Sequence, residues 1–495
     1  MVNISELLGT PSLTSLFWDK PSEEHKLLSE FQGARTGYER RQIMERFQKE
    51  KDGKDFSEYV LPRPILKSAA LHGLRGHMVE AACANSEAVP TSVAIHILCR
   101  FSATLGRTAY IQIGDEQRHL RMFALIVGPT GRGRKGTSSQ MPRKLFEMVE
   151  QNFLHYAGWL PLQQLSTLAT GEGLIHRLRD SHTWYTGDKE HVDSGVEDKR
   201  LFCDVSEFAG VLAQGRRDGS TLTTVVRDAF DGVTLTIPTK ASFNRASQTH
   251  VVIVGSVPET EIVRNLNEVD KTNGFANRFP MFYSARDKIV PSPKPTDEVY
   301  MKQFAEHLAW ALWEGSKLGE IPMTAEARGY WEHELYGKIE DADYPAIVSS
   351  LLARRTTHTL IFAALLALLN REKVIDLEHL EAANAWMDYW AETVLFVFSS
   401  GEQNEQAIKE KALRDEVVAA ISALGGRKVN HSDLANKVTN KYKRIDVNAK
   451  QVREALEALQ RESPARIYSH SITTSGRAAS CYTLVDLMDI EDASE

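Results

Sequence analysis

The chain has 495 residues, of which 42% are hydrophobic and 25% are charged. This length and composition are those of a globular protein with roughly two to four domains, and they exclude a low-complexity or intrinsically disordered chain. The formal net charge of −7 excludes a protein that is basic over its whole surface, so any binding of nucleic acid must be local.

The cysteines and the apolar segments bear on the compartment. The four cysteines are scattered and form no CxxC pair, which favours a reducing compartment and argues against a structural zinc site. The N-terminus has no basic-then-apolar signal segment, and no apolar run reaches the ~18 residues that a membrane helix needs. We therefore expect a soluble, cytoplasmic protein with no membrane partner.

The first part of the chain divides into two. Residues 1–60 are polar and mixed in charge, with helical spacing of their apolar residues, so we expect an N-terminal helical appendage. Apolar periodicity then predicts helices over 71–83 and 91–105, and alternation over 109–113 predicts a strand. A charged turn at 115–121 leads into the most informative stretch of the sequence.

Residues 123–138 have the composition of a phosphate-binding loop. An apolar run over 123–127 predicts a short strand, a glycine-rich loop follows it, and helical spacing resumes over about 142–153. Glycines allow backbone N–H groups to approach an anion, a helix N-terminus favours negative charge, and a lysine reaches the outer phosphates. Strand, loop and helix in this order predict a nucleotide site, and an ordinary glycine-rich surface loop is the alternative.

The loop departs from the P-loop pattern G-x-x-x-x-G-K-[ST] by one residue. Counted from Gly128, the second glycine falls correctly, but Arg134 stands at the lysine position and Lys135 follows it. We expect Lys135 to be the catalytic lysine on the phosphates of ATP, and Thr137 or Ser138 to provide the hydroxyl for Mg²⁺. The other residues expected to contact the nucleotide are Gly128, Thr130, Gly131, Gly133, Arg134 and Gly136.

A second apolar run leads into acidic residues. Residues 199–208 predict a strand with Asp204 near its end and Glu207 three positions later. In P-loop NTPases an acid at a strand end orients the water shell of Mg²⁺, and a neighbouring glutamate polarises the attacking water. We therefore expect Asp204 to lie at the metal and the nucleotide, and Glu207 to be catalytic. Those two acids are usually adjacent, so Glu207 could serve in either role. A strand end with Asp204 or Ser206 as a helix N-cap is the alternative.

The alternation of helix and strand continues after these acids. The spacing predicts a helix over 220–230, a strand over 234–237 and a buried strand over 250–256, whose small polar end suits a group that senses the γ-phosphate. Arg278 follows within 272–279 and is a candidate catalytic arginine finger, because a planar guanidinium stabilises charge that builds on a transferred phosphoryl group. A surface salt bridge is the alternative for this arginine.

Residues 300–400 are expected to be wholly helical and to form a helical lid. The predicted helices are 299–315, 324–339, 346–370 and 377–398. Arg354 and Arg355 open the most apolar of these helices, and we expect Arg355 to face the nucleotide. Ordinary capping contacts with neighbouring residues are the alternative.

Residues 410–486 differ in character from the rest of the chain. Three short helical stretches are followed by two alternating strands, which is the order of a winged helix. Between Arg427 and Arg477 there are 11 Lys/Arg against 5 Asp/Glu, a local excess of positive charge that predicts contacts with DNA. The residues expected to contact DNA are Lys441, Lys443, Arg444, Lys450, Arg453 and Arg477. Docking of a protein partner is the alternative, because winged helices serve both uses.

A series of motifs runs from Leu71 to Phe398. They are Leu71-His-Gly-Leu-Arg-Gly-His-Met-Val79, Ser86-Glu-Ala-Val-Pro90, Arg118-His through Gly128, Gly133-Arg-Lys-Gly-Thr-Ser138, Gly171-Glu-Gly173, Ser206-Glu-Phe-Ala-Gly-Val-Leu212, Arg227-Asp-Ala-Phe-Asp-Gly232, Asn273-Gly-Phe-Ala-Asn-Arg-Phe279, and Arg355 with Leu366-Ala-Leu-Leu369 and His379-Leu. The series resembles a group of P-loop ATPases that are borne on phages and plasmids and are often fused or adjacent to primase-polymerase modules. Its order also resembles that of AAA+ replicative helicases.

The resemblance implies a fold and its ligands. It implies an α/β P-loop NTPase core of AAA+ or RecA-like type over 61–299 and a helical lid over 300–400. The residue patterns add the N-terminal segment 1–60 before them and the winged helix 410–486 after them. ATP and Mg²⁺ are the implied cofactors, and a ring-shaped homo-oligomer such as a hexamer is the implied assembly. Relatives often carry His where this chain has Ser256. The sequence contains no primase-polymerase domain, so priming would need a separate primase.

These expectations lead to three hypotheses for the function. The first is an ATP-dependent DNA motor, a ring-forming replicative helicase or helicase loader of a phage, plasmid or mobile element, in which Arg278 acts on a neighbouring subunit. The second is a nucleotide-regulated DNA-binding initiator, or an assembly or defence switch without unwinding activity, because Gly136 and the separated acids fit a slow or inactive ATPase. The third is a phage structural or interaction protein that retains only the fold.

Overall fold

The computed structural model describes residues 63–484 apart from residues 72, 239–242, 267–269, 271–272, 343, 345, 442–448, 462–466 and 475–476. The described residues form two compact units, 63–399 and 400–484. The expected N-terminal appendage, residues 1–60, lies outside the described part of the chain.

Two helices and a hairpin lead into the first unit. A 3-10 turn, η3 (Ser68–Leu71), precedes α4 (Leu74–Cys83) and α5 (Pro90–Leu105), which confirm the two helices expected from apolar periodicity. Pro90 begins α5, where its missing N–H costs no hydrogen bond, and every later residue of the helix is buried. The expected charged turn is instead part of a hairpin of β1 (Tyr110–Ile113) and β2 (Glu116–His119).

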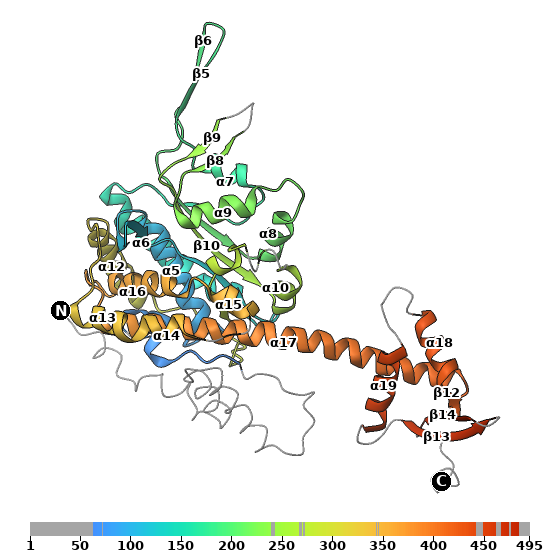
Figure 1. Ribbon diagram of the computed structural model, residues 1–495. Coiled ribbons are helices and arrows are strands. Elements are labelled where there is room, and N and C mark those ends of the chain that lie inside the picture. The colour runs from blue at the N-terminus through green and yellow to red at the C-terminus, as the bar shows by residue number, and fades with distance from the viewer. Residues whose placement is uncertain are drawn as a thin grey trace. The chain divides into compact units, whose positions relative to one another are not determined.

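The centre of the first unit is a five-stranded sheet with the order β11-β3-β10-β7-β4, in which every neighbouring pair is parallel. The strands are β3 (Phe123–Val127), β4 (Gln163–Leu165), β7 (Arg200–Val205), β10 (His250–Val257) and β11 (Met281–Tyr283). All residues of β3, β10 and β11 are buried, as is typical of a parallel sheet with helices on its faces (Figure 1). The α/β class expected for this region is confirmed.

Helices connect the strands of this sheet. They are α6 (Lys135–Val149), which continues as the π-helical turn η4 (Glu150–Leu154) and the 3-10 turn η5 (His155–Ala157), then α7 (Gly171–Arg177), α8 (Phe208–Gly215), α9 (Leu222–Asp231), α10 (Glu259–Asn265) and the 3-10 turn η6 (Ala276–Arg278). Helix α6 begins earlier than expected, because Pro142 lies inside it rather than in its first turn. Proline is favoured in a first turn and removes one main-chain hydrogen bond further inside a helix, so its position was misleading.

Two antiparallel hairpins extend from the central sheet in Figure 1. β5 (His182–Thr186) pairs with β6 (Lys189–Asp193), and β8 (Leu235–Pro238) pairs with β9 (Phe243–Ala246). The polar and charged sequence of residues 187–198 predicts an exposed loop or insertion, but Lys189–Asp193 form the strand β6. The strand is mostly exposed, so it lacks the apolar alternation that identifies a half-buried strand.

The region after the sheet is helical, as expected. Its helices are α12 (Glu298–Gly315), α13 (Ala325–Tyr330), α14 (Tyr336–Glu340), α15 (Ala346–Leu352), α16 (Arg355–Leu369) and α17 (Leu377–Ala423), with a π-helical turn, η7 (Trp331–Leu335), between α13 and α14. One helix was expected where α15 and α16 lie, and the chain breaks at Arg354, which precedes α16. The segment Ala346–Leu369 is long and apolar enough to cross a membrane, but 78% of its apolar window is buried, as in a core helix.

The second unit has a core of its own. After the C-terminal part of α17 it contains β12 (Val429–Asn430), α18 (His431–Lys441), α19 (Ala449–Arg461), β13 (Ile467–Thr474) and β14 (Arg477–Leu484). The strands form an antiparallel sheet with the order β12-β14-β13. Its core includes Val417, Leu434, Val452, Leu456 and Ile467. The three helical stretches and two strands expected from the sequence are all present.

Candidate functional site

β3, the glycine-rich loop and α6 form the expected strand–loop–helix unit at the carboxyl end of the sheet. We call residues 128–138 the cradle. Lys135 is the first residue of α6, and its Nζ atom donates a hydrogen bond to the carbonyl oxygen of Gly128, 2.8 Å away. A longer contact of 3.5 Å joins the same Nζ atom to the carbonyl oxygen of Val257, at the end of β10. The lysine therefore reaches across the loop, as a phosphate contact from this position requires.

Two acids that the sequence reasoning missed act on Lys135. Burial lowers the pKa of Lys135, while the carboxylates of Glu259 and Glu261 oppose that shift. Both acids lie in the first turn of α10, directly after β10. The end of β10 is adjacent to the cradle, because Val257 pairs with Val127 in the sheet. The signal that could have found these acids is their position just after a fully buried strand.

Close backbone packing requires two of the cradle glycines. A Cβ atom at Gly128 would lie 1.9 Å from the carbonyl oxygen of Ser284, and one at Gly133 would lie 2.8 Å from the carbonyl oxygen of Pro129. Ser284 follows β11, and its hydroxyl donates a hydrogen bond to the carbonyl oxygen of Gly133 at 2.8 Å. The cradle therefore packs against the residue that follows β11. Gly128 and Gly133 allow this close packing, and they also allow backbone N–H groups to approach an anion.

The contacts of Thr137 and Ser138 indicate which of the two hydroxyl groups is free to bind a metal ion. Ser138 is fully buried, and its Oγ atom accepts a hydrogen bond from the N–H of Val89 and donates one to the carbonyl oxygen of Arg134, both at 2.9 Å. Thr137 is exposed. Gly136 stands between the lysine and Thr137, and the space around it is open. These contacts favour Thr137 over Ser138 as the hydroxyl for Mg²⁺.

Arg134 is held by an acid from outside the cradle. Its Nε atom lies 2.5 Å from Oε2 of Glu87, and Glu87 also accepts hydrogen bonds of 3.1 Å from Arg286 and from the N–H of Val290. The hydrogen bond from Val290, followed by the two arginines, lowers the pKa of Glu87. Arg134 has a φ of 44°, a left-handed conformation that is costly for a residue with a side chain. The ion pair with Glu87 accounts for an arginine at this strained position and braces the cradle.

Asp204 does not lie beside the cradle but further back along the sheet, toward the amino end of β3. In the sheet it is paired with Val254, which is paired with Ala124, three residues before the end of β3. At roughly 3.3 Å per residue, this distance along the strand is about 10 Å. Its Oδ2 atom lies 2.9 Å from Nη2 of Arg100, whose side chain is only 3% exposed. Burial lowers the pKa of Arg100 and Asp204 opposes the shift, so the described contact of Asp204 is a partly buried ion pair.

Glu207 lies closer to the level of the cradle. Val205, the last residue of β7, pairs with Gly255, so Glu207 stands near the level of Val257 and of the end of β3. Its side chain is exposed, and the residue beside it, where a second acid is usual, is the exposed Ser206. Of the two acids selected from the sequence, Glu207 is therefore better placed to orient a water molecule at the cradle.

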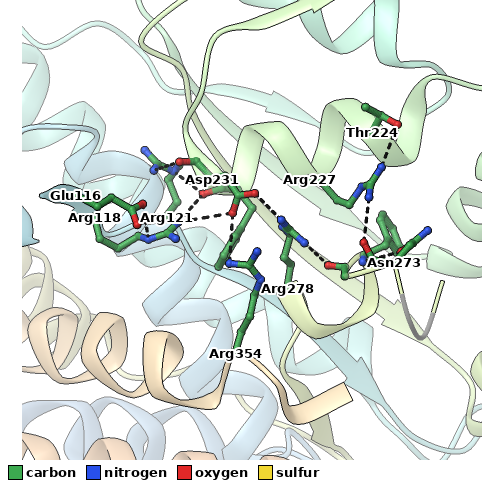
Figure 2. Close-up of polar contacts among 12 residues, drawn as sticks. Glu116, Arg118, Arg121, Thr224, Arg227, Asp231, Asn273, Arg278 and Arg354 are labelled. Atoms are coloured by element: carbon green, nitrogen blue, oxygen red, sulfur yellow. Dashed lines mark hydrogen bonds and ion pairs between the residues drawn. The ribbon is translucent and has the colours of Figure 1, made fainter. Parts of the chain in front are cut away.

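Arg278 lies at the opposite edge of the sheet from the cradle. It ends η6 just before β11, and Arg121 comes just before β3, so both stand at the amino ends of parallel strands. The five residues of β3 separate this edge from the cradle by about 15 Å, at roughly 3.3 Å per residue. Arg278 is buried and pairs with Asp231 at the end of α9, where Arg118, Arg121 and Arg354 also gather (Figure 2). We call Arg118, Arg121, Arg278 and Arg354 the arginine cluster.

The two arginines at the start of α16 differ in their contacts. Arg355 is buried, pairs with Asp388 of α17, and donates a hydrogen bond of 3.1 Å to the hydroxyl of Tyr344. Arg354 has a side chain that is 27% exposed, and its Nη1 atom lies 3.4 Å from Oδ1 of Asp231. Arg355 therefore joins two helices, and it is Arg354 that lies beside the candidate finger.

The basic residues expected to contact DNA are placed only in part. Arg453 is exposed on α19. Lys441 ends α18, Lys450 lies in the first turn of α19, and Arg477 begins β14. The other two, Lys443 and Arg444, lie outside the described residues. Contact of these residues with DNA stays a prediction.

Comparisons with known proteins leave the family open. No protein-family model matches the chain, and no curated protein matches it. Among solved structures it is similar to a full-length MCM homolog from Methanopyrus kandleri, with 13% sequence identity and a TM-score of 0.35 over 67% of this chain and 63% of that chain. The match thus spans less than two thirds of that protein. This likeness is too distant to assign an activity, so function has to be argued from the site itself.

Proposed function

We propose that the chain is an ATP-dependent DNA motor, a ring-forming replicative helicase or helicase loader of a phage, plasmid or mobile element. The observation that carries the proposal is the 2.8 Å contact of Lys135 Nζ with the carbonyl oxygen of Gly128, in a loop between a buried parallel strand and a helix N-terminus. From this position the lysine, the loop N–H groups and the helix N-terminus bind the outer phosphates of ATP.

The parallel sheet and the position of the cradle in it support an α/β NTPase core, which we propose to be of the AAA+ or RecA-like type. Numbered along the chain, the five strands lie in the order 5-1-4-3-2, so that β10 separates the cradle strand β3 from the acidic strand β7. The cradle strand therefore lies inside a parallel sheet, and parallel sheets bind their ligands at the carboxyl ends of the strands. Lys135, Glu207 and Glu259 all follow strands at that edge.

The residues at the cradle fit a magnesium nucleotide. Hard cations such as Mg²⁺ prefer oxygen ligands, and the exposed Thr137 hydroxyl and the carboxylates of Glu207 and Glu259 are of that kind. Bound Mg²⁺ neutralises charge on the phosphates. In the proposed site Lys135 holds the outer phosphates and Glu207 orients the attacking water.

The position of the arginine cluster supports an oligomer. Arg278 and Arg354 are separated from the cradle of their own chain by about the length of a β-strand, so a role on phosphate requires a second copy. A head-to-tail contact, in which the cluster of one copy faces the cradle of the next, closes into a ring when the rotation allows it. A ring is also the assembly expected of a replicative helicase.

The second unit supports an interaction with DNA. Its order of helix, β12, α18, α19, β13 and β14, with an antiparallel sheet, fits a winged helix. The local excess of Lys and Arg between residues 427 and 477 suits contacts with DNA phosphates. In this proposal the second unit holds DNA, the first unit hydrolyses ATP, and a separate primase supplies priming.

The test is ATP hydrolysis measured with and without DNA. Lys135→Ala is expected to abolish hydrolysis, because it removes the phosphate contact. Lys144→Ala is the matched control, since it removes an exposed lysine from the same helix, and it is expected to leave the rate unchanged. DNA-stimulated hydrolysis that persists in Lys135→Ala would contradict the proposed site.

One observation favours a second function. The residue after the lysine is Gly136, so the position that usually carries the metal-binding hydroxyl has no side chain, which fits a slow ATPase. The chain would then be a nucleotide-regulated DNA-binding initiator, or an assembly or defence switch without unwinding activity. Displacement of a strand from forked DNA in the presence of ATP supports the motor, and DNA binding without displacement supports the switch.

A further inference from the structure

The arginine cluster converges on one carboxylate at the amino edge of the sheet. Asp231, the last residue of α9, pairs with Arg278, with Nη1 of Arg354 at 3.4 Å and with Nη1 of Arg118 at 3.8 Å. Arg121 donates a hydrogen bond of 3.1 Å to the backbone carbonyl oxygen of Asp231. Figure 2 shows the four arginines gathered around Asp231, although residues 118–121, Arg278 and Arg354 are far apart in the chain.

The cluster holds more positive than negative charge. The other acid that Figure 2 labels there is Glu116, whose Oε1 atom lies 3.1 Å from Nε of Arg118. Four guanidinium groups therefore face the carboxylates of Asp231 and Glu116, and Asp228 is a third acid close enough to interact with Arg278 and Asp231. Burial lowers the pKa of Arg354, and nearby Arg278 adds to the shift. Burial, followed by neighbouring arginines, lowers the pKa of Arg121 to about 9. Such shifts are expected where like charges are held together with few counter-charges.

The guanidinium groups are positioned by more than Asp231. The guanidinium carbons of Arg118, Arg354 and Arg278 lie 5.4, 5.8 and 6.0 Å from the centroid of the buried Phe230 ring. Arg118 and Arg121 also donate hydrogen bonds to the carbonyl oxygen of Phe230, at 3.4 and 2.9 Å. Because this ring and carbonyl hold the arginines in place, the cluster is a built site that does not depend on Asp231 alone.

Asp231 stands where an anion from solvent would enter the cluster. The side chains of Arg118 and Arg278 are 6% and 8% exposed, whereas those of Asp231 and Arg354 are 28% and 27% exposed. Arginine binds carboxylate and phosphate oxygens with the same donors and in similar geometry. The carboxylate of Asp231 therefore occupies the place that phosphate oxygens would take in this cluster.

We propose that Asp231 is an internal competitor, whose carboxylate in the free subunit fills the place in the arginine cluster that the terminal phosphate of a nucleotide in the cradle of a second copy would take. The inference rests on the proposed function for the identity of the nucleotide. Arg118, Arg278 and Arg354 exchange the carboxylate for the phosphate when two copies meet. A phosphate presented at an interface competes at a high effective concentration, whereas the same anion free in solution competes poorly.

The test measures binding of inorganic triphosphate to the full chain by calorimetry. All variants carry Lys135→Ala, so that the cradle contributes no lysine. Adding Asp231→Asn, which keeps the shape of the side chain and removes its charge, is expected to tighten triphosphate binding roughly tenfold. Adding Arg354→Ala as well is expected to abolish that gain. Asp218→Asn is the matched control, since it removes the same charge at an exposed site before α9, and the affinity should not change.

Two further points keep the outcomes distinct. Equal affinity of the folded Asp231→Asn variant and its parent overturns the inference. If Asp231→Asn does not fold, Asp231→Ser removes the same carboxylate with a smaller side chain, and tightening is again expected while no change overturns the inference. If the native chain hydrolyses ATP but Asp231→Asn does not bind triphosphate more tightly, the proposed motor is supported and the role of Asp231 as a competitor is overturned. If Asp231→Asn tightens triphosphate binding but the native chain hydrolyses no ATP, the competitor stands and the proposed motor is overturned.

Discussion

The carbonyl oxygen of Gly128 accepts a hydrogen bond of 2.8 Å from Nζ of Lys135. This contact closes the cradle with the group that is expected to bind phosphate, so an incoming nucleotide has to exchange with a carbonyl oxygen of the chain itself. The residue after the lysine is Gly136, and the nearest exposed hydroxyl is that of Thr137. The cradle therefore has a lysine at the start of α6 but no hydroxyl directly after it, unlike the usual P-loop pattern.

Gly136→Ser should lower the Mg²⁺ concentration needed for half-maximal ATP hydrolysis severalfold. The substitution places a hydroxyl directly after the lysine, and a Cβ atom at this position meets no other atom within 4 Å. A Mg²⁺ titration of the hydrolysis rate measures the effect. Gly136→Ala is the matched control, because it adds the same Cβ atom without an oxygen. Identical titrations for the two variants would contradict the account of this position.

Glu87→Gln should make the thermal stability less sensitive to acid. The pKa of Glu87 is lowered in the folded protein, chiefly by the hydrogen bond from the N–H of Val290 and then by Arg134 and Arg286. A carboxyl group of this kind stabilises the fold fully above its unfolded pKa near 4.5, and the contribution is lost as the pH falls through the lower folded pKa. Tm should therefore fall more steeply with acidification in the native chain than in the variant. Parallel curves of Tm against pH for the two proteins would contradict a stabilising role for the contacts of Glu87.

Asp204→Asn should destabilise the fold and leave the Mg²⁺ dependence of hydrolysis unchanged. The substitution leaves the buried Arg100 without its charged partner, which costs about 3 kcal/mol in the free energy of unfolding. Urea unfolding and a Mg²⁺ titration measure the two quantities.

Glu207→Gln is the comparison for that substitution. Its exposed side chain predicts little change in unfolding, whereas its position at the level of the cradle predicts loss of hydrolysis. If Asp204→Asn instead alters the Mg²⁺ dependence of hydrolysis and leaves the stability unchanged, Asp204 rather than Glu207 lies at the metal.

Arg355→Ala should lower the free energy of unfolding by about 3 kcal/mol, because it leaves the buried carboxylate of Asp388 without its arginine. The affinity for a non-hydrolysable ATP analogue, measured on the folded variant, should not change. Arg354→Ala is the neighbouring control, since its partly exposed side chain predicts a smaller loss of stability. A weaker affinity for the analogue in Arg355→Ala alone would restore this residue to the nucleotide site.

The sequence predicted those parts of the fold that have a strong local pattern. The buried strands β3 and β10 were recognisable as continuous apolar runs, and the amphipathic helix α9 because its apolar residues repeat with the helical period. β4 was missed because it has only three residues, Gln163–Leu165, and none of them is buried. β2 was missed because its charged residues read as a turn, and its partner β1 decides the outcome.

The candidate site divides in the same way. Lys135 and Thr137 were recognisable because the residues that form a phosphate-binding loop are neighbours in the chain. The action of Glu259 on Lys135 depends on β10 lying beside β3, and the meeting of Arg354 with Asp231 joins residues far apart in the chain. Contacts that depend on strand order and helix packing join residues far apart in the chain, so local patterns in a single sequence do not predict them. Arg355 was therefore preferred to Arg354 without a physical reason to separate them.

A mixture of two inactive variants tests the central claim most directly, namely that a cradle and an arginine cluster from different copies form one hydrolytic site. Lys135→Ala retains the cluster, and Arg278→Ala retains the cradle. In a head-to-tail ring made from equal amounts of both, roughly one interface in four joins an intact cradle to an intact cluster. ATP hydrolysis should reappear in the mixture at about that fraction of the native rate. A mixture as inactive as its two components would contradict the account.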